Sequence, residues 1–297
     1  MMRSFLSVML LGLLSLVTTE CSTLGSARSL PTQNATAAVL AGPAFRERVR
    51  IREFADLPRY YTYYSPQAIV AGSDGLLWVV DGIDQDFGVD TIVGIDPSGK
   101  AKYRYHEQGT SQGTAFTDIA LGSDGALWMP DDLNVQIVRM TTKGRFTNYR
   151  LDSHMSPISI TSGPDKALWF TNGGGAIGRI TTKGKITTYP LSNGPWDIAA
   201  GPDGALWFTE PNNGIGRITT TGQITQYSGG ITSHPYSIAA GPDGALWFTE
   251  AYNGSKIGRI TTSGQVTEFS NGTLSLEAYN DIAAGPDGAM WFTEVSN

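Results

Sequence analysis

Short apolar runs separated by tight-turn sequences recur along the chain after residue 50. In one copy, a first run is followed by Gly201-Pro202-Asp203-Gly204, in which Pro presets φ and Asp-Gly supplies the positive-φ step of a turn. Runs this short, with turns between them and no sustained helical period, predict four antiparallel strands. The four predicted strands of this copy are 196–200, 205–209, 215–219 and 223–227.

The same unit repeats along the chain. Gly201–Glu210 recurs identically at 241–250, and again with one change at 285–294. Looser copies are found at 72–81, 122–131 and 163–172. Strand-like repeats about 40–45 residues long are typical of propeller blades. We therefore predict an all-β fold, a β-propeller of four-stranded blades with six Trp motifs. The repeated Trp is interpreted as a large ring that fills the space between blades.

The two ends of the repeat array differ from its middle. The last copy stops after its second strand, so we expect an incomplete last blade and a chain cut short there. Residues 47–54 resemble a lone fourth strand, and a propeller closes its ring by adding such a strand to its last blade. We predict that 47–54 has this role.

The segment before the repeats predicts export. A short positive start and an apolar run over 5–17 are typical of a signal peptide, expected at 1–27. Residues 28–44 are rich in Ala, Thr and Pro and predict a flexible linker, which leaves 45–297 as the propeller domain. A secreted or periplasmic location follows. Lipoprotein anchoring at Cys21 is the weaker alternative, because Glu20 stands where a small residue is needed.

Charge and composition narrow the class of partner. The chain has 21 basic and 27 acidic residues, a net charge of −6, and no run of Lys and Arg. This argues against nucleic acid or an anionic membrane surface as the main partner. We expect a monomer that binds a small molecule. A single Cys excludes an intrachain disulfide.

Topology predicts where a site lies. The first and second strands are antiparallel, so the start of the first and the end of the second meet at one rim. Five of the six residues that end the second strands are acidic: Asp81, Asp131, Asn172, Glu210, Glu250 and Glu294. Aromatic residues stand beside them, and a rim of carboxylates and rings is typical of a ligand pocket. The predicted ligand-binding residues are Trp196, Tyr236, Tyr279, Asn280 and Glu210.

The rim carboxylates allow several kinds of chemistry. Glu250 and Glu294 are candidates for holding Mg²⁺ or Ca²⁺, because these ions prefer oxygen ligands. Clustered carboxylates also raise one another's pKa, which would suit a general acid or base. The structural alternative is that they pair with arginines of the third strands: Arg179, Arg217 and Arg259. His234, expected in the loop before a first strand, is a further candidate for proton transfer.

The repeated units resemble the virginiamycin B lyase (streptogramin lyase) family. The likeness covers 47–297 and rests on Gly-Pro-Asp-Gly-Ala-Leu-Trp-Phe-Thr-Glu followed by Asn-Gly and Ile-Gly-Arg-Ile-Thr. The resemblance implies a seven-bladed propeller and a magnesium-dependent elimination that opens the ester bond of a cyclic depsipeptide. It implies a histidine after the Pro that opens the first strand in each of the last two blades, where this chain has Tyr236 and Asn280. It also implies a Glu at the end of the last second strand, where this chain has Glu294.

Three functions remain open. The first is a carbon–oxygen lyase acting on a cyclic ester or lactone, with Glu294, Glu250 and His234 as its catalytic candidates. The second is a propeller that binds a ligand or partner without catalysis. The third is a metal-dependent lactonase.

Overall fold

The computed structural model describes residues 66–84, 89–107, 113–252, 254–270, 276 and 280–293. All of the secondary-structure elements in these ranges are β-strands, which confirms the predicted all-β class. They form five four-stranded antiparallel sheets and one two-stranded sheet. No helix long and apolar enough to cross a membrane occurs among these residues.

Each sheet is one blade, and its strands follow one another in sequence. The first blade has β1 (Pro66–Ala71), β2 (Leu77–Asp84), β3 (Val89–Ile95) and β4 (Ala101–Tyr105). The second has β5 (Ala120–Leu121), β6 (Leu127–Asp131), β7 (Gln136–Met140) and β8 (Phe146–Arg150). The third has β9 (Pro157–Ser162), β10 (Leu168–Asn172), β11 (Ala176–Ile180) and β12 (Ile186–Pro190).

The later blades keep the same order. The fourth has β13 (Ile198–Ala200), β14 (Leu206–Glu210), β15 (Gly214–Ile218) and β16 (Ile224–Tyr227). The fifth has β17 (His234–Ala240), β18 (Leu246–Ala251), β19 (Lys256–Ile260) and β20 (Val266–Phe269). The sixth has β21 (Ile282–Ala284) and β22 (Met290–Phe292), the two strands predicted for it. Residues 1–27, 28–44 and 47–54 lie outside the described residues, so the leader, the linker and the closing strand stay predictions.

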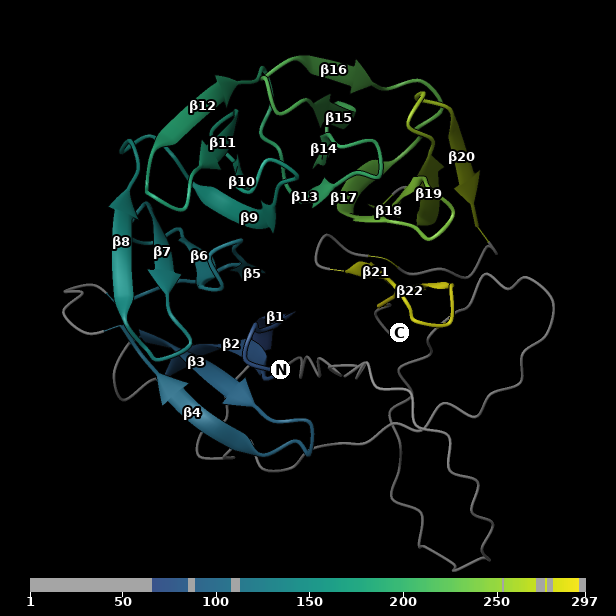
Figure 1. Cartoon of the computed structure of the whole chain (residues 1–297). Helices are drawn as coiled ribbons and strands as arrows, with labels where there is room; N and C mark the ends of the chain where they lie inside the picture. Colours follow the sequence, from purple (N-terminus) through teal and green to yellow (C-terminus); the bar gives the residue numbers. More distant parts are fainter. Residues whose placement is uncertain are drawn as a thin grey trace, which may run out of the picture.

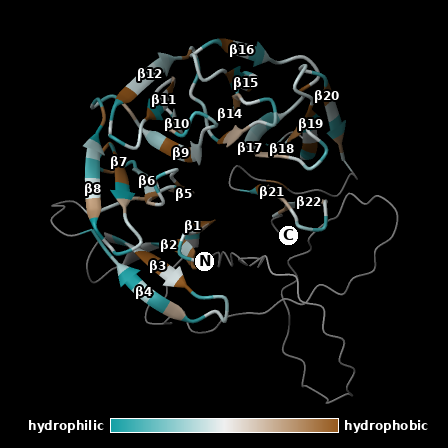
Figure 2. Cartoon of the chain, in the orientation of Figure 1, coloured by the Kyte–Doolittle hydropathy of each residue, from teal (hydrophilic) through white to brown (hydrophobic). Residues whose placement is uncertain are grey.

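The blades follow one another around a ring, with the first strand of each nearest the centre and the fourth outermost (Figure 1). The second strands β6, β10 and β14 are buried at every position, because a blade packs on each side of them. The outer strands alternate between half-buried and exposed positions, and β8 is largely hydrophilic (Figure 2). The strand order and burial together confirm the propeller.

The hydrophobic core lies between blades. Trp169 and Tyr189 of the third blade pack against Ile198 and Phe208 of the fourth. The sheet itself is thinned to admit the Phe ring, because Gly216 lies opposite Phe208 and a Cβ on this glycine would overlap the ring. The interpretation of the repeated Trp as a structural wedge is consistent with this packing.

One turn cluster repeats in the second to fifth blades. In the fourth blade, Asp203 Oδ1 accepts a hydrogen bond from Trp207 Nε1 at 3.0 Å, and Asp203 Oδ2 pairs with Arg217 Nε at 2.7 Å. The guanidinium carbon of Arg217 lies 5.9 Å from the centroid of the Trp207 ring, which stacks on Tyr227 at 5.4 Å. The equivalent Arg–Asp pairs are Arg139–Asp124, Arg179–Asp165 and Arg259–Asp243.

This cluster corrects one interpretation of the sequence. Arg179, Arg217 and Arg259 pair with aspartates of the Gly-Pro-Asp turns, at the rim opposite the predicted site. The structural alternative, in which these arginines neutralise the carboxylates that end the second strands, is therefore wrong. Glu210 and Glu250 must be stabilised in another way.

Threonine hydroxyls join neighbouring blades. Thr209 Oγ1 accepts a hydrogen bond from Asp197 N of its own blade at 3.0 Å and donates to Tyr236 O of the next blade at 2.6 Å. Thr171 donates to Trp196 O at 2.8 Å, and Thr249 donates to Asn280 O at 3.2 Å. The hydroxyl thus serves two blades at once.

Candidate functional site

The predicted rim is formed as the topology required. Pro235 of β17 pairs with Glu250 of β18, and Phe116 bridges to Asp131 at the end of β6. The start of a first strand and the end of a second strand therefore share one rim. Tyr279 and Glu294 belong to this prediction but lie outside the described residues.

An aromatic cluster lies on this rim, across the fourth and fifth blades. The Tyr236 ring is edge-on to Trp196, with centroids 5.6 Å apart and planes at 88°. On its other side it is edge-on to Tyr252, at 5.9 Å and 79°. Tyr252 also contacts His234, with ring centroids 6.3 Å apart. Trp196 and Tyr236, both predicted from the sequence, are thus brought together.

Tyr252 was missed by the sequence analysis. It is 51% exposed and adopts a φ of 62°, which is uncommon for a bulky residue. Its backbone carbonyl accepts a hydrogen bond from Ser233 Oγ at 2.6 Å, and this contact helps to hold the strained turn. The sequence signal was available, since Tyr252 stands two residues after the repeated motif, in a turn that differs from the one after Glu210.

His234 is the first residue of β17 rather than a loop residue, which corrects the expectation for it. Its Nδ1 lies 2.6 Å from the carbonyl oxygen of Pro211 in the fourth blade. A carbonyl only accepts, so Nδ1 carries the hydrogen and Nε2 of the neutral ring is left as the basic nitrogen. The contact across two blades fixes the ring orientation.

Glu250 is fully buried at the same rim. Its Oε2 accepts a hydrogen bond from Ser233 N at 3.1 Å, while its Oε1 has no hydrogen-bond partner. Burial raises the pKa of Glu250 well above its usual range, and the nearby Glu268 carboxylate adds to this. Lys256 partly offsets the rise, but it already forms an ion pair with Glu268.

Glu210 is the equivalent residue of the fourth blade. It is fully buried; Oε2 accepts a hydrogen bond from Asn213 Nδ2 at 3.2 Å, and Oε1 has no partner. Burial is the main cause that raises the pKa of Glu210. The expectation that Glu210 and Glu250 raise each other's pKa gains no support. Burial is the largest cause of the raised pKa in both residues, and the carboxylate that adds to the rise at Glu250 is Glu268.

The residues that end the second strands of earlier blades have structural roles. Asp131 accepts from Asn134 Nδ2 at 2.8 Å and from Gln136 Nε2 at 2.9 Å. Asn172 Oδ1 accepts from Ser156 N at 2.6 Å and from Gly174 N at 3.1 Å. These bonds cap the turn that follows each strand. Among the described residues, buried carboxylate oxygens without a hydrogen-bond partner occur at Glu107, Glu210 and Glu250, and the last two lie on the blades that carry the aromatic cluster.

The predicted residue Asn280 lies at the joint between the fifth and sixth blades. It is buried, its carbonyl accepts from Thr249, and its Nδ2 donates to Thr293 Oγ1 at 3.4 Å. These contacts give it a structural role beside any contact to a ligand.

The described residues bring no cluster of metal-binding side chains to the rim. In these ranges, no group of three or more His, Cys, Asp or Glu side chains is placed to hold a metal ion. Glu250 has one carboxylate neighbour, Glu268, and that neighbour is already paired with Lys256. The magnesium prediction therefore depends on Glu294 and stays a prediction.

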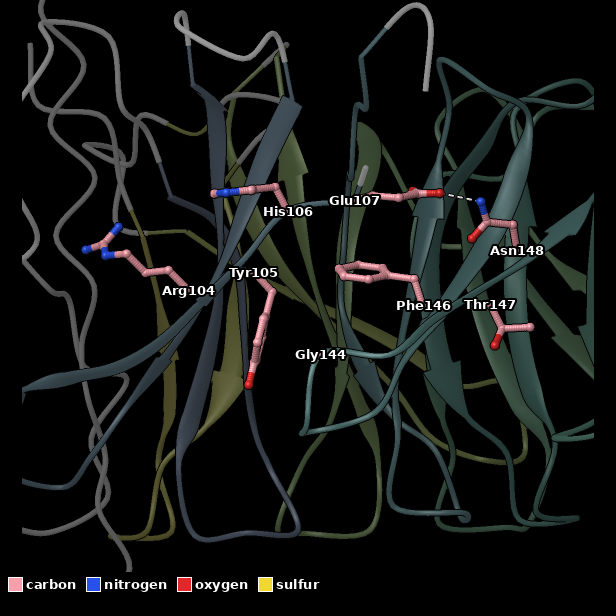
Figure 3. A pocket seen from close by; sticks show the side chains of 8 residues that line it. All are labelled: Arg104, Tyr105, His106, Glu107, Gly144, Phe146, Thr147 and Asn148. Carbon is pink, nitrogen blue, oxygen red and sulfur yellow. Dashed lines mark hydrogen bonds between the residues drawn. The ribbon is translucent and has the colours of Figure 1, made fainter. Parts of the chain in front are cut away.

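A separate hollow lies on the outer side, between β4 and β8 of the first two blades (Figure 3). It has a volume of 580 Å³ and is lined by Tyr105, Glu107, Phe146 and Asn148, among others. Glu107 is buried and accepts a hydrogen bond from Asn148. The hollow is separate from the aromatic rim of the fourth and fifth blades, which is the candidate site.

Comparison with known proteins agrees with this architecture. The family model described as the virginiamycin B lyase family matches residues 58–297. The chain belongs to the virginiamycin B lyase family. The resemblance drawn from the repeated units is thereby confirmed. A search of curated proteins gave no significant match.

Solved members of this family share the fold. A structure of virginiamycin B lyase from Staphylococcus aureus is 37% identical to this chain, with 77% of each chain covered and a TM-score of 0.67. A catalytically inactive histidine-to-alanine variant of the S. aureus enzyme with quinupristin is also 37% identical, with 78% of each chain covered and a TM-score of 0.68. A gluconolactonase from Xanthomonas campestris is 16% identical, covers 78% of this chain and 86% of its own, and has a TM-score of 0.52, so it shows the fold alone.

Proposed function

We propose that this member of the family binds a cyclic depsipeptide or a related cyclic ester at the rim of the fourth and fifth blades. The observation that carries the proposal is the aromatic cluster of Trp196, Tyr236 and Tyr252 beside His234. A relative in the same family has been solved with quinupristin, which supports a ligand of this class.

The cluster has the properties that such a ligand needs. The cluster presents aromatic rings at the rim, and a contact with an aromatic or apolar group of the ligand is worth about 0.5–1.5 kcal/mol beyond its buried area. Tyr252 is 51% exposed although it is large and apolar, so a ligand that covered it would gain from the burial. The His234 ring adds a polar group at the edge of this surface.

Binding is tested with quinupristin as the probe, by titration calorimetry on the full chain. We expect saturable binding by the wild type, and about tenfold weaker binding, or about 1.4 kcal/mol, in Tyr252→Ala and Trp196→Ala. The matched control is Tyr103→Ala, because Tyr103 is also an exposed tyrosine, at 48%, but lies on the first blade. No binding by the wild type, or equal losses in Tyr252→Ala and Tyr103→Ala, would contradict the proposal.

A second candidate function is opening of the bound ester by carbon–oxygen elimination. It is favoured by two groups at this rim: Glu250, whose raised pKa keeps a carboxyl proton available at higher pH, and His234, whose Nε2 is basic. In this reaction a base removes a proton from the carbon next to the one that bears the ester oxygen. The carbon–oxygen bond then breaks, a double bond forms, and the carboxylate leaves with the electron pair.

Binding stands first because two positions depart from the family pattern. Tyr236 and Asn280 occupy the places where the resemblance implies histidines, and Glu250 is fully buried. The reaction is tested by mass spectrometry of the ligand after incubation, with and without added Mg²⁺. Elimination leaves the mass unchanged and creates a double bond, lactonase hydrolysis adds one water, and a pure binder returns the intact ring. Loss of the elimination product in Glu250→Gln and His234→Ala would assign the reaction to this rim.

A further inference from the structure

Five residues on the inner side of the ring form a continuous belt. They are Asp118, Ser159, Asp197, Ser237 and Asp281, one from each of the second to sixth blades. Each stands at the same place before the turn glycine of its blade, within or just before the innermost strand (Figure 1). Aspartate and serine alternate along the belt, and the first blade has Ala68 at this place.

Hydroxyl groups link the carboxylates across the blades. Ser159 Oγ lies 2.9 Å from Asp118 Oδ2 and 2.7 Å from Asp197 Oδ1. Ser237 Oγ lies 3.0 Å from Asp197 Oδ2 and 2.6 Å from Asp281 Oδ1. The four oxygen–oxygen contacts have hydrogen-bond lengths and connect five blades in sequence.

Two of the carboxylates also accept a hydrogen bond from the backbone of the next blade. Asp118 Oδ2 accepts from Ile160 N of the third blade at 2.8 Å. Asp197 Oδ2 accepts from Ile238 N of the fifth blade at 2.8 Å. Each of these aspartates therefore fixes the first strand of its neighbour as well as its own position.

A count of hydrogens shows what the belt lacks. A serine hydroxyl carries one hydrogen, so two serines supply hydrogens for two of the four oxygen–oxygen contacts. With all three carboxylates ionised, the other two contacts would bring lone pairs face to face. A proton on a carboxyl makes it a donor to serine and turns such a contact into a hydrogen bond.

We propose that the belt holds at least one carboxyl proton in mildly acidic solution and releases it as the pH rises through neutrality, which weakens the joints between the blades. This device is independent of the ligand and of the reaction proposed above. It makes the inner wall of the ring sensitive to pH.

The surroundings of the belt favour the bound proton. Burial raises the pKa of Asp118 to about 7, and the negative charge of Asp197 contributes. Burial also raises the pKa of Asp197, followed by the charge of Asp281. Hydrogen bonds from backbone N–H groups and from Ser159 lower both pKa values and offset part of the rise.

Within the part of the chain that the structure describes, no cation pairs with the belt. The strands directly behind it contribute threonine hydroxyls that accept hydrogen bonds from the belt backbone: Thr171 Oγ1 from Ser159 N, Thr209 Oγ1 from Asp197 N and Thr249 Oγ1 from Ser237 N. None of the ion pairs in the described part of the chain involves a belt residue. The charges that act on Asp118 and Asp197 are those of belt carboxylates.

The sign of the effect follows from linkage. An aspartate in the unfolded chain has a pKa of about 3.9, so the folded belt binds its proton more tightly than the unfolded chain does. The contribution of Asp118 to the free energy of unfolding is fully present below about pH 4 and is lost as the pH rises through about 7. Loss of the proton leaves like charges facing each other across the blade joints.

The first experiment is a carbon-13 titration of Asp carboxyl groups in the wild-type chain. We expect at least one belt carboxyl to titrate near neutrality. Burial also raises the pKa of Asp90 to about 7, so the titration is repeated in Asp90→Asn, where a signal with a neutral midpoint should persist. If no Asp carboxyl of that variant titrates above about pH 5, the proposal is overturned.

The second experiment counts protons released on unfolding at about pH 6, by urea unfolding in weakly buffered solution. We expect Asp118→Asn to release about one proton fewer than the wild type, because its amide cannot carry the carboxyl proton. Asp203→Asn is the matched control. The Asp203 carboxyl is ionised in both states at this pH, so this variant should release as many protons as the wild type. Equal release by Asp118→Asn and the wild type would also overturn the proposal.

Discussion

The aspartates of the Gly-Pro-Asp turns and those of the belt come from the same repeat but are held in opposite ways. Partial burial raises the pKa of Asp203, but hydrogen bonds from Trp207 and Arg217 outweigh it, and the pKa lies below its usual range. Asp197 has serine and backbone donors without a cation, and burial raises its pKa. The depth of burial and the hydrogen-bond donors around each carboxyl together decide whether the folded state prefers its charged or its neutral form.

The two groups also differ in how they repeat. The turn aspartate occurs in all six blades and bonds the Trp Nε1 of its own blade, from Asp74–Trp78 to Asp287–Trp291. The belt alternates aspartate with serine, so that no two carboxylates contact each other directly. The turn aspartate bonds within its own blade, whereas each belt residue faces the belt residues of neighbouring blades, where an unbroken run of carboxylates would bring like charges together.

The largest effect is expected from the turn cluster. Trp207 is fully buried, so Trp207→Ala should lower the free energy of unfolding by about 3–5 kcal/mol through lost packing and a cavity. Trp196, half-buried on the rim, is the one Trp outside the repeated motif, and Trp196→Ala should cost about 1 kcal/mol or less. Urea unfolding measures both. Similar costs would contradict the division between a structural Trp and a ligand-binding Trp.

Removal of a turn carboxylate comes second. Asp203→Ala leaves Trp207 Nε1 and Arg217 without their partner and should cost about 1–3 kcal/mol. Asp152→Ala is the control, because the side chain of Asp152 is 70% exposed, and a change of about 0.5 kcal/mol or less is expected. If thermal or urea unfolding gave the same result for both, the cluster would not contribute as its geometry implies.

The pH dependence should separate the two groups of aspartates. Turn aspartates have lowered pKa values, so their contribution is present above the unfolded pKa of about 3.9 and is lost as the pH falls through their folded pKa. Urea midpoints of the wild type should therefore fall from about pH 5 to about pH 3, and Asp203→Asn should flatten this acid limb. Asp118→Asn should flatten the limb on the alkaline side. If both variants changed the same limb, the comparison would fail.

The smallest expected change is a gain in stability. Tyr252 has a φ of 62°, a backbone conformation that Asn tolerates better than Tyr, so Tyr252→Asn should raise the free energy of unfolding by about 0.5–1 kcal/mol. The same change should weaken quinupristin binding. The control Tyr103→Asn replaces a strand residue and should lose stability. A lower free energy of unfolding in Tyr252→Asn would show that the positive φ of Tyr252 does not destabilise the folded chain.

The sequence predicted most of the fold because the first and second strands occur in six copies and the third and fourth strands in five. The period, the turn dipeptides and the Trp spacing each pointed to blades, and the structure confirms them. The site was harder to predict. Shared topology placed Glu210, Glu250, Trp196 and Tyr236 at one rim, but it could not show that both glutamates are buried or that Arg217 pairs elsewhere.

Two features needed coordinates for a clear physical reason. Arg217 pairs with the carboxylate that its side chain can reach. Asp203, in the adjoining turn, is nearer than a residue at the opposite rim. Tyr252 depends on a local positive φ that no repeated pattern encodes. The belt, in contrast, is present in the sequence as alternating Asp and Ser at one place in each copy. That these residues bond to one another between blades follows only from the coordinates.

The threonine joints have a consequence for how the molecule comes apart. Thr171, Thr209 and Thr249 each donate to the blade that follows, so every joint is made by one blade pair alone and all joints have the same direction. Coupling between nearest neighbours alone allows blades to unfold one after another rather than all at once. Hydrogen exchange should then show protection that changes from blade to blade, and a Thr209→Val substitution should loosen the amides on either side of its joint before it affects distant blades.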